Sequence, residues 1–330
     1  MISRKYPSTR LRRLRQSESI IKLTSECILS KDDLIQPVFV KEGLHDKEPI
    51  ESMPGIFRFG EESVLKEIRE INQLGIRAIA IFPVIDPLKK DLTGTEATKR
   101  DNLISRVLDS IKSKFPDMLV IADVALDPYT DHGHDGVVED NKILNDQTLE
   151  VLAEQSLILA EAGADIIAPS DMMDGRIGFI RKKLDQNSFE DKIILSYAAK
   201  YNSKYYGPFR DAVNSKNNLG TSDKSSYQMN PANSLEALNE VAMDIEEGAD
   251  IVMVKPGMPY LDIISKIKKE FKIPTFAYQV SGEYAMIIES VNKGWLDKDV
   301  IIESLTSFKR AGADAVLTYF AKDLIKEFNL

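Results

Sequence analysis

The 330-residue chain contains a single cysteine, Cys27, and therefore cannot form an internal disulfide. So low a cysteine content fits the reducing cytosol, and we expect a cytoplasmic location. The sequence also has no apolar run near the roughly 20 residues that a membrane-spanning helix needs, and no secretory hydrophobic region. We therefore expect a globular protein that has neither a disulfide framework nor a membrane partner.

Acidic residues outnumber basic ones over the whole chain, but basic residues are concentrated at its start. The net charge of −9 argues against nucleic acid as a partner. The first 13 residues nevertheless carry five basic side chains and no acid: Arg4, Lys5, Arg10, Arg12 and Arg13. Because no clear amphipathic run precedes Ser17, we interpret residues 1–30 as a surface arm that contacts a partner subunit, and not as a transit peptide.

The distribution of apolar residues predicts an α/β fold. Hydrophobic residues make up 43% of the chain, enough for a sizeable core. Helical patterns separate most of a series of short apolar runs that we expect to be strands. The eight expected strands are residues 34–40, 77–83, 118–124, 165–169, 192–198, 250–255, 273–280 and 314–319.

A recurring junction makes this architecture more specific. The sequence Gly-Ala-Asp occurs at residues 163–165, 248–250 and 312–314, each time between a helical pattern and a β-branched run. Glycine supplies the left-handed conformation that ends a helix, and such runs suit parallel strands covered on both faces. Asn233 and Glu236 resemble a capping box for the helix before the second junction. We predict a TIM (β/α)₈ barrel over residues 31–330.

Two lysines end apolar strands where an ammonium ion would be poorly hydrated. Lys200 follows the fifth expected strand and Lys255 ends the sixth. Either lysine alone could simply extend to the surface, but barrel strands place both on one rim, where burial and mutual repulsion lower a lysine pKa. Free amines attack carbonyls, so we predict Schiff-base chemistry on a keto substrate. The polar residues expected at this rim are Asp123, Ser170, Lys200, Lys255, Ser281 and Tyr319.

A long segment rich in Tyr, Asn, Ser and Gly follows Lys200. Residues 201–231 show little apolar periodicity, and a connection of this length is often an active-site lid. Arg210 and Lys224 could pair with a substrate carboxylate while Phe209 excludes water. The alternative is a flexible loop whose charges are simply hydrated.

Several motifs along the chain resemble the porphobilinogen synthase family, also called 5-aminolevulinate dehydratases. The principal ones are LSYAAK at 195–200, YYGPFR at 205–210, YQMNP at 227–231, MVKP at 253–256 and QVSGEY at 279–284. Further matches are RLRRL at 10–14, PVFV at 37–40, SMPG at 52–55 and TY at 318–319. The resemblance covers nearly the whole chain. It implies condensation of two 5-aminolevulinate molecules to porphobilinogen, with loss of two waters, in tetrapyrrole (heme) biosynthesis.

The resemblance also implies roles for individual residues. Lys255 would hold one substrate molecule, in the P site, and Lys200 the other, in the A site, each as a Schiff base. Asp123 is a candidate for proton transfer. The carboxylate of the A-site molecule would be bound by Arg210, Lys224 and Gln228, and that of the P-site molecule by Ser281 and Tyr319. The remaining pocket-lining matches are Phe209, Tyr278 and Ser170.

One segment departs from the zinc-dependent members of that family. Those members carry three cysteines where this chain has Ala125, Asp127 and Asp135. Without thiolates a soft tetrahedral site cannot form, so we expect no catalytic Zn²⁺ and suggest that the two aspartates act on protons or water. His132 and His134 leave a zinc alternative open.

Family members that respond to magnesium hold a hydrated Mg²⁺ away from the active site. The matching carboxylates are Asp174 and Glu240, which could bind an allosteric Mg²⁺ through water, or could bind no ion. The resemblance further implies a homo-octamer in which the arm contacts a neighbouring subunit.

Two other functions are compatible with a barrel. A class I aldolase needs only one Schiff-base lysine and, for sugar phosphates, a glycine loop that binds phosphate after a late strand. Here the expected seventh strand is followed by Ser281, Gly282 and Glu283, whose acid would repel phosphate. A non-catalytic binding barrel would have no reason to keep two desolvated amines.

Overall fold

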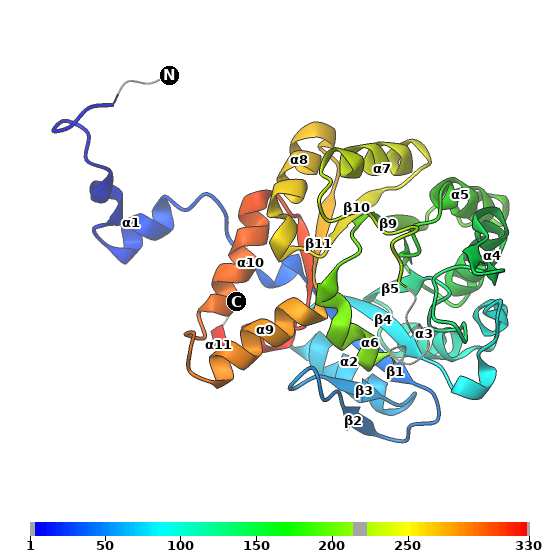
Figure 1. Ribbon diagram of the computed structural model, residues 1–330. Helices are drawn as coiled ribbons and strands as arrows, with labels where there is room; N and C mark the ends of the chain where they lie inside the picture. Colours follow the sequence, from blue (N-terminus) through cyan, green and yellow to red (C-terminus); the bar gives the residue numbers. More distant parts are fainter. Residues whose placement is uncertain (1–3, 214–222, 329–330) are drawn as a thin grey trace.

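The computed structural model describes residues 4–213 and 223–328, and within them eight parallel strands form a closed barrel (Figure 1). The strand order is β1, β4, β5, β8, β9, β10, β11 and β12, and the pairing of β12 with β1 closes the sheet. Every barrel strand overlaps one of the eight expected runs, so the predicted TIM barrel is confirmed. The bounds are β1 Leu34–Lys41, β4 Ala78–Val84, β5 Leu119–Val124, β8 Ile166–Pro169, β9 Ile193–Lys200, β10 Ile251–Lys255, β11 Thr275–Gln279 and β12 Ala315–Thr318.

Helices cover the outside of the barrel because each presents one apolar face to the strands. In α2, for example, Val64, Ile68 and Ile71 lie three or four residues apart and are fully buried. No helix in the described part of the chain is long and apolar enough to cross a membrane. The covering helices are α2 Ser63–Gln73, α3 Leu103–Lys114, α4 Asn145–Glu161, α5 Arg176–Gln186, α7 Leu235–Glu246, α8 Leu261–Phe271, α9 Ser281–Asn292, α10 Val300–Ala311 and α11 Ala321–Phe328. Short 3₁₀ helices occupy Lys31–Asp33, Pro87–Lys89, Thr95–Thr98 and Met258–Tyr260.

The Gly-Ala-Asp junctions form as expected, and their aspartates have a role that the sequence did not reveal. The glycines adopt φ angles of 101°, 110° and 113° at Gly163, Gly248 and Gly312, in the left-handed region. Each aspartate accepts a backbone N–H at the start of the neighbouring strand: Asp165 from Val120 (2.8 Å), Asp250 from Ile194 (2.8 Å) and Asp314 from Thr275 (2.7 Å). These bonds join adjacent strands at the barrel end opposite the lysines.

The expected capping box of α7 is wrong in detail. The N-cap residue is Ser234, and its side chain makes no capping hydrogen bond. The Asn233 amide instead donates to the Glu236 carboxylate at 2.7 Å, so the two side chains bind each other and leave the helix backbone uncapped by them.

Two short hairpins were not expected from the sequence. Strand β2 (Lys47–Pro49) pairs antiparallel with β3 (Phe57–Phe59), which extends the sheet beside β1. Strand β6 (Val138–Glu139) pairs with β7 (Lys142–Ile143) through Asp140 and Asn141, whose φ angles of 48° and 60° are those of a type I′ turn. Two- or three-residue strands are too short for alternation to be visible in sequence.

The segment interpreted as a lid is partly helical. It contains a 3₁₀ turn, η5 (Lys204–Tyr206), and α6 (Gly207–Ala212), and its residues 214–222 lie outside the described part. Both described ends are fixed to the barrel rim, because the N–H of Tyr201 donates to the Lys255 carbonyl (2.9 Å) and that of Met229 to the Lys200 carbonyl (3.0 Å).

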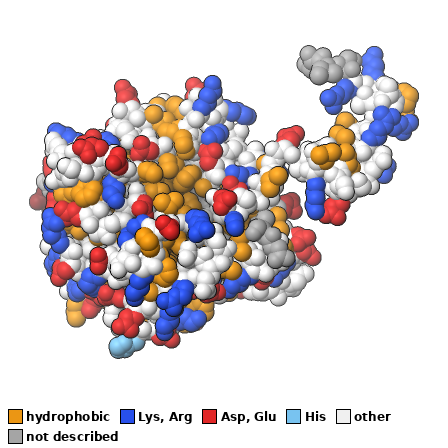
Figure 2. All heavy atoms as spheres, turned by 180° about the vertical axis from the view of Figure 1, so that it is seen from behind, with side chains coloured by type: hydrophobic (Ala, Val, Ile, Leu, Met, Phe, Trp, Pro, Cys, Tyr) orange, Lys and Arg blue, Asp and Glu red, His pale blue; other side chains and the backbone are white. Residues whose placement is uncertain are grey.

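The described part of the N-terminal arm, residues 4–30, extends away from the barrel (Figure 1). It contains η1 (Leu11–Arg15) and α1 (Glu18–Leu23), and neither element has a buried residue. Figure 2 shows basic and apolar side chains side by side along it. The exposed apolar side chains of the arm include Tyr6, Leu11, Leu14, Ile21, Leu23 and Ile28.

Candidate active site

The two strand-end lysines are direct neighbours at the carboxyl rim of the barrel. Lys200 ends β9 and Lys255 ends β10, and the two residues are register partners in that strand pair. Their exposed fractions are only 5% and 7%. The barrel therefore holds two nearly buried amines side by side, which is the arrangement that two Schiff bases require.

Lys255 is surrounded by aromatic rings. Its Nζ lies 4.7 Å from the ring centre of Tyr278, 5.1 Å from those of Tyr197 and Phe209, and 5.4 Å from that of Tyr206. Burial, reinforced by the positive charge of Lys200, lowers the pKa of Lys255 to about 7. A substantial fraction of this amine is therefore unprotonated and nucleophilic at neutral pH.

Lys200 has a polar environment instead. Its ammonium donates a hydrogen bond to the backbone carbonyl of Ser170 at the end of β8, and it lies 3.9 Å from Asp135 Oδ2. The two amines thus differ in surroundings: one is held among rings and the other beside a carbonyl and a carboxylate. This difference gives the site two chemically distinct positions for a carbonyl substrate.

Asp127 and Asp135 converge on a third amine. Lys224 Nζ lies 3.1 Å from Asp127 Oδ2 and 2.9 Å from Asp135 Oδ1. Burial raises the pKa of Asp127, whereas the positive charges of Lys200 and Lys224 overcome burial and hold the pKa of Asp135 below its ordinary value. Carboxyls whose pKa values are driven apart suit a proton donor and a proton acceptor. The Lys224 ammonium, expected to meet a substrate carboxylate, is paired with these aspartates here.

Asp123, near the end of β5, is a third carboxylate near the lysines. Its Oδ1 is buried and has no hydrogen-bond partner among the described residues. Burial raises the pKa of Asp123 to about 6, although the charge of Lys255 opposes the rise. A carboxylate with one free oxygen and a pKa near neutrality is suited to accept a proton from a substrate.

Two small cavities connect these groups. The first, of about 40 Å³, contains most of the expected substrate-binding residues, and the second, of about 20 Å³, contains Asp123 and Ser170. Both include the two lysines, Asp127 and Phe209. Tyr319 lines neither, but its hydroxyl is hydrogen-bonded to that of Tyr278 at 2.8 Å. The first cavity is also lined by Arg210, Lys224, Gln228, Tyr278 and Ser281.

The lid segment contacts this site directly. The Phe209 N–H donates to Ser281 Oγ (2.8 Å), and the Tyr206 hydroxyl donates to the Lys255 carbonyl (3.1 Å). The Ser281 hydroxyl, expected to bind a substrate carboxylate, therefore holds α6 against α9 in this structure. Tyr197 and Tyr206 were not singled out from the sequence; their signal was their position in the LSYAAK and YYGPFR motifs beside the lysine.

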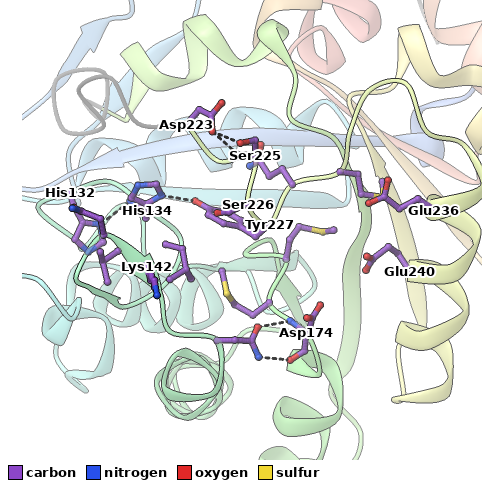
Figure 3. Close-up of a pocket in the computed structure, with 18 residues that line it drawn as sticks. His132, His134, Lys142, Asp174, Asp223, Ser225, Ser226, Tyr227, Glu236 and Glu240 are labelled. Carbon is purple, nitrogen blue, oxygen red and sulfur yellow. Dashed lines mark hydrogen bonds between the residues drawn. The ribbon is translucent and has the colours of Figure 1, made fainter.

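A larger cavity, of about 770 Å³, lies beside the lysine site and shares Gln228 with it. Asp174 enters it from the loop after β8 and Glu240 from α7, on the same side of the cavity in Figure 3. Burial raises the pKa of Glu240, and Asp174 adds to the rise. Two oxygen donors facing a roomy cavity fit a hydrated hard cation held through water.

Residues 125–135, here called the aspartate loop because they include Asp127 and Asp135, also contain two histidines, and both make polar contacts with the protein. His132 Nε2 lies 3.1 Å from the Leu92 carbonyl, and His134 Nδ1 lies 3.2 Å from the Tyr227 hydroxyl. Within residues 4–213 and 223–328, no three side chains of His, Cys, Asp or Glu are grouped so as to hold a metal ion directly.

Comparison with known proteins gives a consistent result. Residues 8–327 match the family model described as ALAD, delta-aminolevulinic acid dehydratase. The chain is 53% identical to the delta-aminolevulinic acid dehydratase of Bradyrhizobium diazoefficiens, over 94% of this chain and 88% of that protein. It is 51% identical to the protein of that name from Methanothermus sociabilis, over 98% of this chain and 99% of that protein.

A solved structure is similar over nearly the whole fold. It is the delta-aminolevulinic acid dehydratase (porphobilinogen synthase) of Toxoplasma gondii ME49 in complex with the reaction product porphobilinogen. The TM-score is 0.94 at 47% identity, and the match covers 96% of this chain and 91% of that one.

Proposed function

We infer, because this chain belongs to the delta-aminolevulinic acid dehydratase family, that it condenses two molecules of 5-aminolevulinate to porphobilinogen with loss of two waters. It is thus a lyase of porphyrin and heme biosynthesis. The observation in the structure that best supports this reaction is the register pairing of Lys200 with Lys255. The direct test is a purified-protein assay, in which two molecules of 5-aminolevulinate should disappear for each porphobilinogen formed.

The two amines provide the covalent chemistry of the proposed mechanism. The unprotonated amine of Lys255 attacks the keto carbon of the P-site molecule, and the keto oxygen leaves as water to form an imine. Lys200, whose ammonium lies 3.9 Å from Asp135 Oδ2, first gives up a proton and then reacts in the same way with the A-site molecule. A protonated imine withdraws electrons from the adjacent carbon, which eases removal of its proton, and holding both molecules together replaces a bimolecular encounter. Each lysine is released as an amine when its carbon–nitrogen bond to one substrate molecule is replaced by a bond between the two substrate molecules.

Three carboxyls are available for the proton transfers. We assign Asp123 as the base that removes a carbon-bound proton, because its Oδ1 is unpaired among the described residues and its pKa is raised to about 6. Asp127 and Asp135 exchange protons with the leaving water and the substrate amine. Their contact with Lys224 keeps this proton relay close to the A-site lysine.

Substrate carboxylates require the site to open and rearrange. The 40 Å³ cavity holds on the order of three waters, far less than two substrate molecules. We therefore propose that residues 201–231 act as a lid, although residues 214–222 lie outside the described part. Movement of α6 away from α9 frees the Ser281 hydroxyl. Ser281 and Tyr319 then bind the P-site carboxylate. Arg210, Lys224 and Gln228 bind the A-site carboxylate.

We do not assign class I aldolase activity to this chain. The family match decides the reaction, and the start of α9 agrees with it. The backbone N–H groups of Val280 and Met258, which could otherwise face a phosphate, donate to the Glu283 carboxylate.

The donor groups of the chain support a proposal for its metal requirement. We propose that Asp174 and Glu240 hold an allosteric Mg²⁺ through water, and that the enzyme uses no catalytic Zn²⁺. Mg²⁺ retains its hydration shell, which the 770 Å³ cavity accommodates. At the aspartate loop, thiolates are replaced by Asp127 and Asp135, and the Lys224 ammonium supplies positive charge between them.

Metal removal should distinguish these assignments. After chelation, Mg²⁺ should stimulate porphobilinogen formation severalfold and Zn²⁺ should not. Glu240→Gln should retain the basal rate but lose the stimulation, while Glu236→Gln, in the same cavity one turn earlier on α7, serves as the matched control and should keep it. Activity restored by Zn²⁺ alone, or full Mg²⁺ stimulation of Glu240→Gln, would contradict the proposed metal sites.

We further propose a cytoplasmic homo-octamer in which the arm packs on a neighbouring subunit. The support is the arm itself, since η1 and α1 bury no residue within one chain and expose several large apolar side chains.

A further inference from the structure

We propose that Glu283 is a positioning residue that fixes the Lys255 amine relative to Ser281; this inference rests on the proposed function, in which the two residues hold one substrate molecule. Glu283 is the third residue of α9 and its side chain is fully buried. From the sequence, Glu283 was expected only to repel phosphate.

The Glu283 carboxylate joins the loops that follow two neighbouring strands. Its Oε1 accepts the Met258 N–H (2.5 Å), three residues after Lys255 at the end of β10. Its Oε2 accepts the Val280 N–H (2.5 Å), between the end of β11 and Ser281. One rigid carboxyl group therefore sets the spacing between the segment that carries the amine and the segment that carries the hydroxyl.

Close packing on both sides leaves either loop little room to shift while the lid segment is in place. A methyl group added at Gly257, beside Met258, would overlap the Phe308 ring of α10. A methyl group added at Gly282, beside Ser281, would overlap the Tyr205 carbonyl of the lid segment. The two loops are thus held from outside by a helix and by the lid, and from within by the Glu283 side chain.

The chemistry of the contact also favours a specific role. Burial raises the pKa of Glu283 to about 8, against the pull of the backbone N–H groups of Val280, Met258 and Gly257. Within the described residues, only burial and backbone N–H groups shift this pKa, and no cation contributes. A buried carboxyl is an expensive way to stabilise a fold even when it is neutral, because an apolar side chain would avoid the desolvation of a polar group. The Glu283 carboxyl can accept hydrogen bonds from two separate backbone segments at once, which an apolar side chain cannot do.

The consequence is selective for one lysine. Glu283 accepts hydrogen bonds from the loops after β10 and β11, and within the described residues no hydrogen bond or ion pair joins it to β9, which carries Lys200. A residue that only stabilises the barrel would affect both amines equally. A residue that positions Lys255 against Ser281 should slow imine formation at Lys255 and raise the KM of the substrate held there.

Glu283→Gln provides the test, because it keeps the size of the side chain but replaces one acceptor oxygen by an NH₂ group that cannot accept. Wild type and variant are incubated with 5-aminolevulinate, reduced with borohydride at successive times and analysed by peptide mass spectrometry. We expect the rate of adduct formation at Lys255 to fall about tenfold or more relative to that at Lys200, since small misplacements of reacting groups have effects of this size. The ratio is measured within one sample and does not depend on the folded fraction.

Two further variants complete the design. Glu283→Asp keeps the carboxyl group but is one methylene shorter, so it should shift the ratio in the same direction even if Glu283→Gln folds poorly. Asp250→Asn is the matched control: it removes a carboxylate that accepts a backbone N–H at the opposite end of β10, and it should lower the melting temperature without changing the ratio. A wild-type ratio in both Glu283 variants would overturn the inference. Absence of adducts at both lysines in the wild type would instead refute the proposed function.

Discussion

Replacing Lys255 with methionine should abolish porphobilinogen formation while making the protein more stable. The nucleophile is lost, so turnover should fall on the order of 10⁴-fold or more. Methionine has a similar length and carries no charge into the ring of aromatic side chains around Nζ. The Lys255 side chain destabilises the folded protein, because its ammonium form is desolvated at 7% exposure.

The stability gain should depend on pH in a defined direction. The pKa of Lys255 is about 7 in the folded protein against an ordinary 10.5, so between these values the unfolded chain binds more protons than the folded one. The lysine's penalty is therefore full below pH 7 and fades as the pH rises toward 10.5. We expect Lys255→Met to raise the free energy of unfolding by on the order of 4 kcal/mol at pH 6 and by much less at pH 10.

Denaturant unfolding at the two pH values, together with the turnover assay, measures both effects. Lys192→Met is the matched control, since Lys192 precedes β9 at the far end of the barrel and burial also lowers its pKa. That variant should remain active. Turnover in Lys255→Met, or a stability change independent of pH, would show that Lys255 is not the desolvated nucleophile.

Asp123→Asn should lower turnover by about 10² to 10⁴-fold, the range for loss of a general base. The substitution preserves shape but removes the carboxylate that we assign to abstract a carbon-bound proton. The pKa of Asp123 is raised to about 6, so the wild-type rate should fall as the pH drops below 6, where the base becomes protonated. The residual activity of the variant should lack this dependence.

Trapping of the imines separates the base from the nucleophiles. Borohydride adducts on both lysines should persist in Asp123→Asn, because imine formation precedes the proton abstraction. Asp165→Asn, at the opposite end of the neighbouring strand, is the control and should keep near-wild-type turnover. An Asp123→Asn variant with a wild-type rate and pH profile would remove Asp123 from the mechanism.

The barrel could be predicted from the sequence because its determinants are local. Apolar runs located all eight strands, three of them directly after a Gly-Ala-Asp junction, and once the strands were ordered Lys200 and Lys255 had to be neighbours. Local sequence patterns do not predict which of several nearby groups a polar side chain will bind. Asn233 matched a capping box, yet its amide binds the Glu236 side chain instead of the helix backbone.

What could not be predicted depends on contacts between distant segments. Lys224 lies 97 residues from Asp127 in the chain, so its pairing with the two aspartates follows only from the closed fold. The same holds for the Tyr206 ring over Lys255 and for the two backbone segments held by Glu283. Sequence patterns identified which residues reach the rim, and the fold determines which of them touch.

The most direct test of the two-amine mechanism is to map covalent adducts on the wild-type protein. The chain is incubated with 5-aminolevulinate, reduced with borohydride, digested and analysed by mass spectrometry. We predict reduced substrate adducts on Lys200 and on Lys255, and none on the matched lysine Lys192. Adducts on neither Lys200 nor Lys255, in a protein that still forms porphobilinogen, would contradict the mechanism.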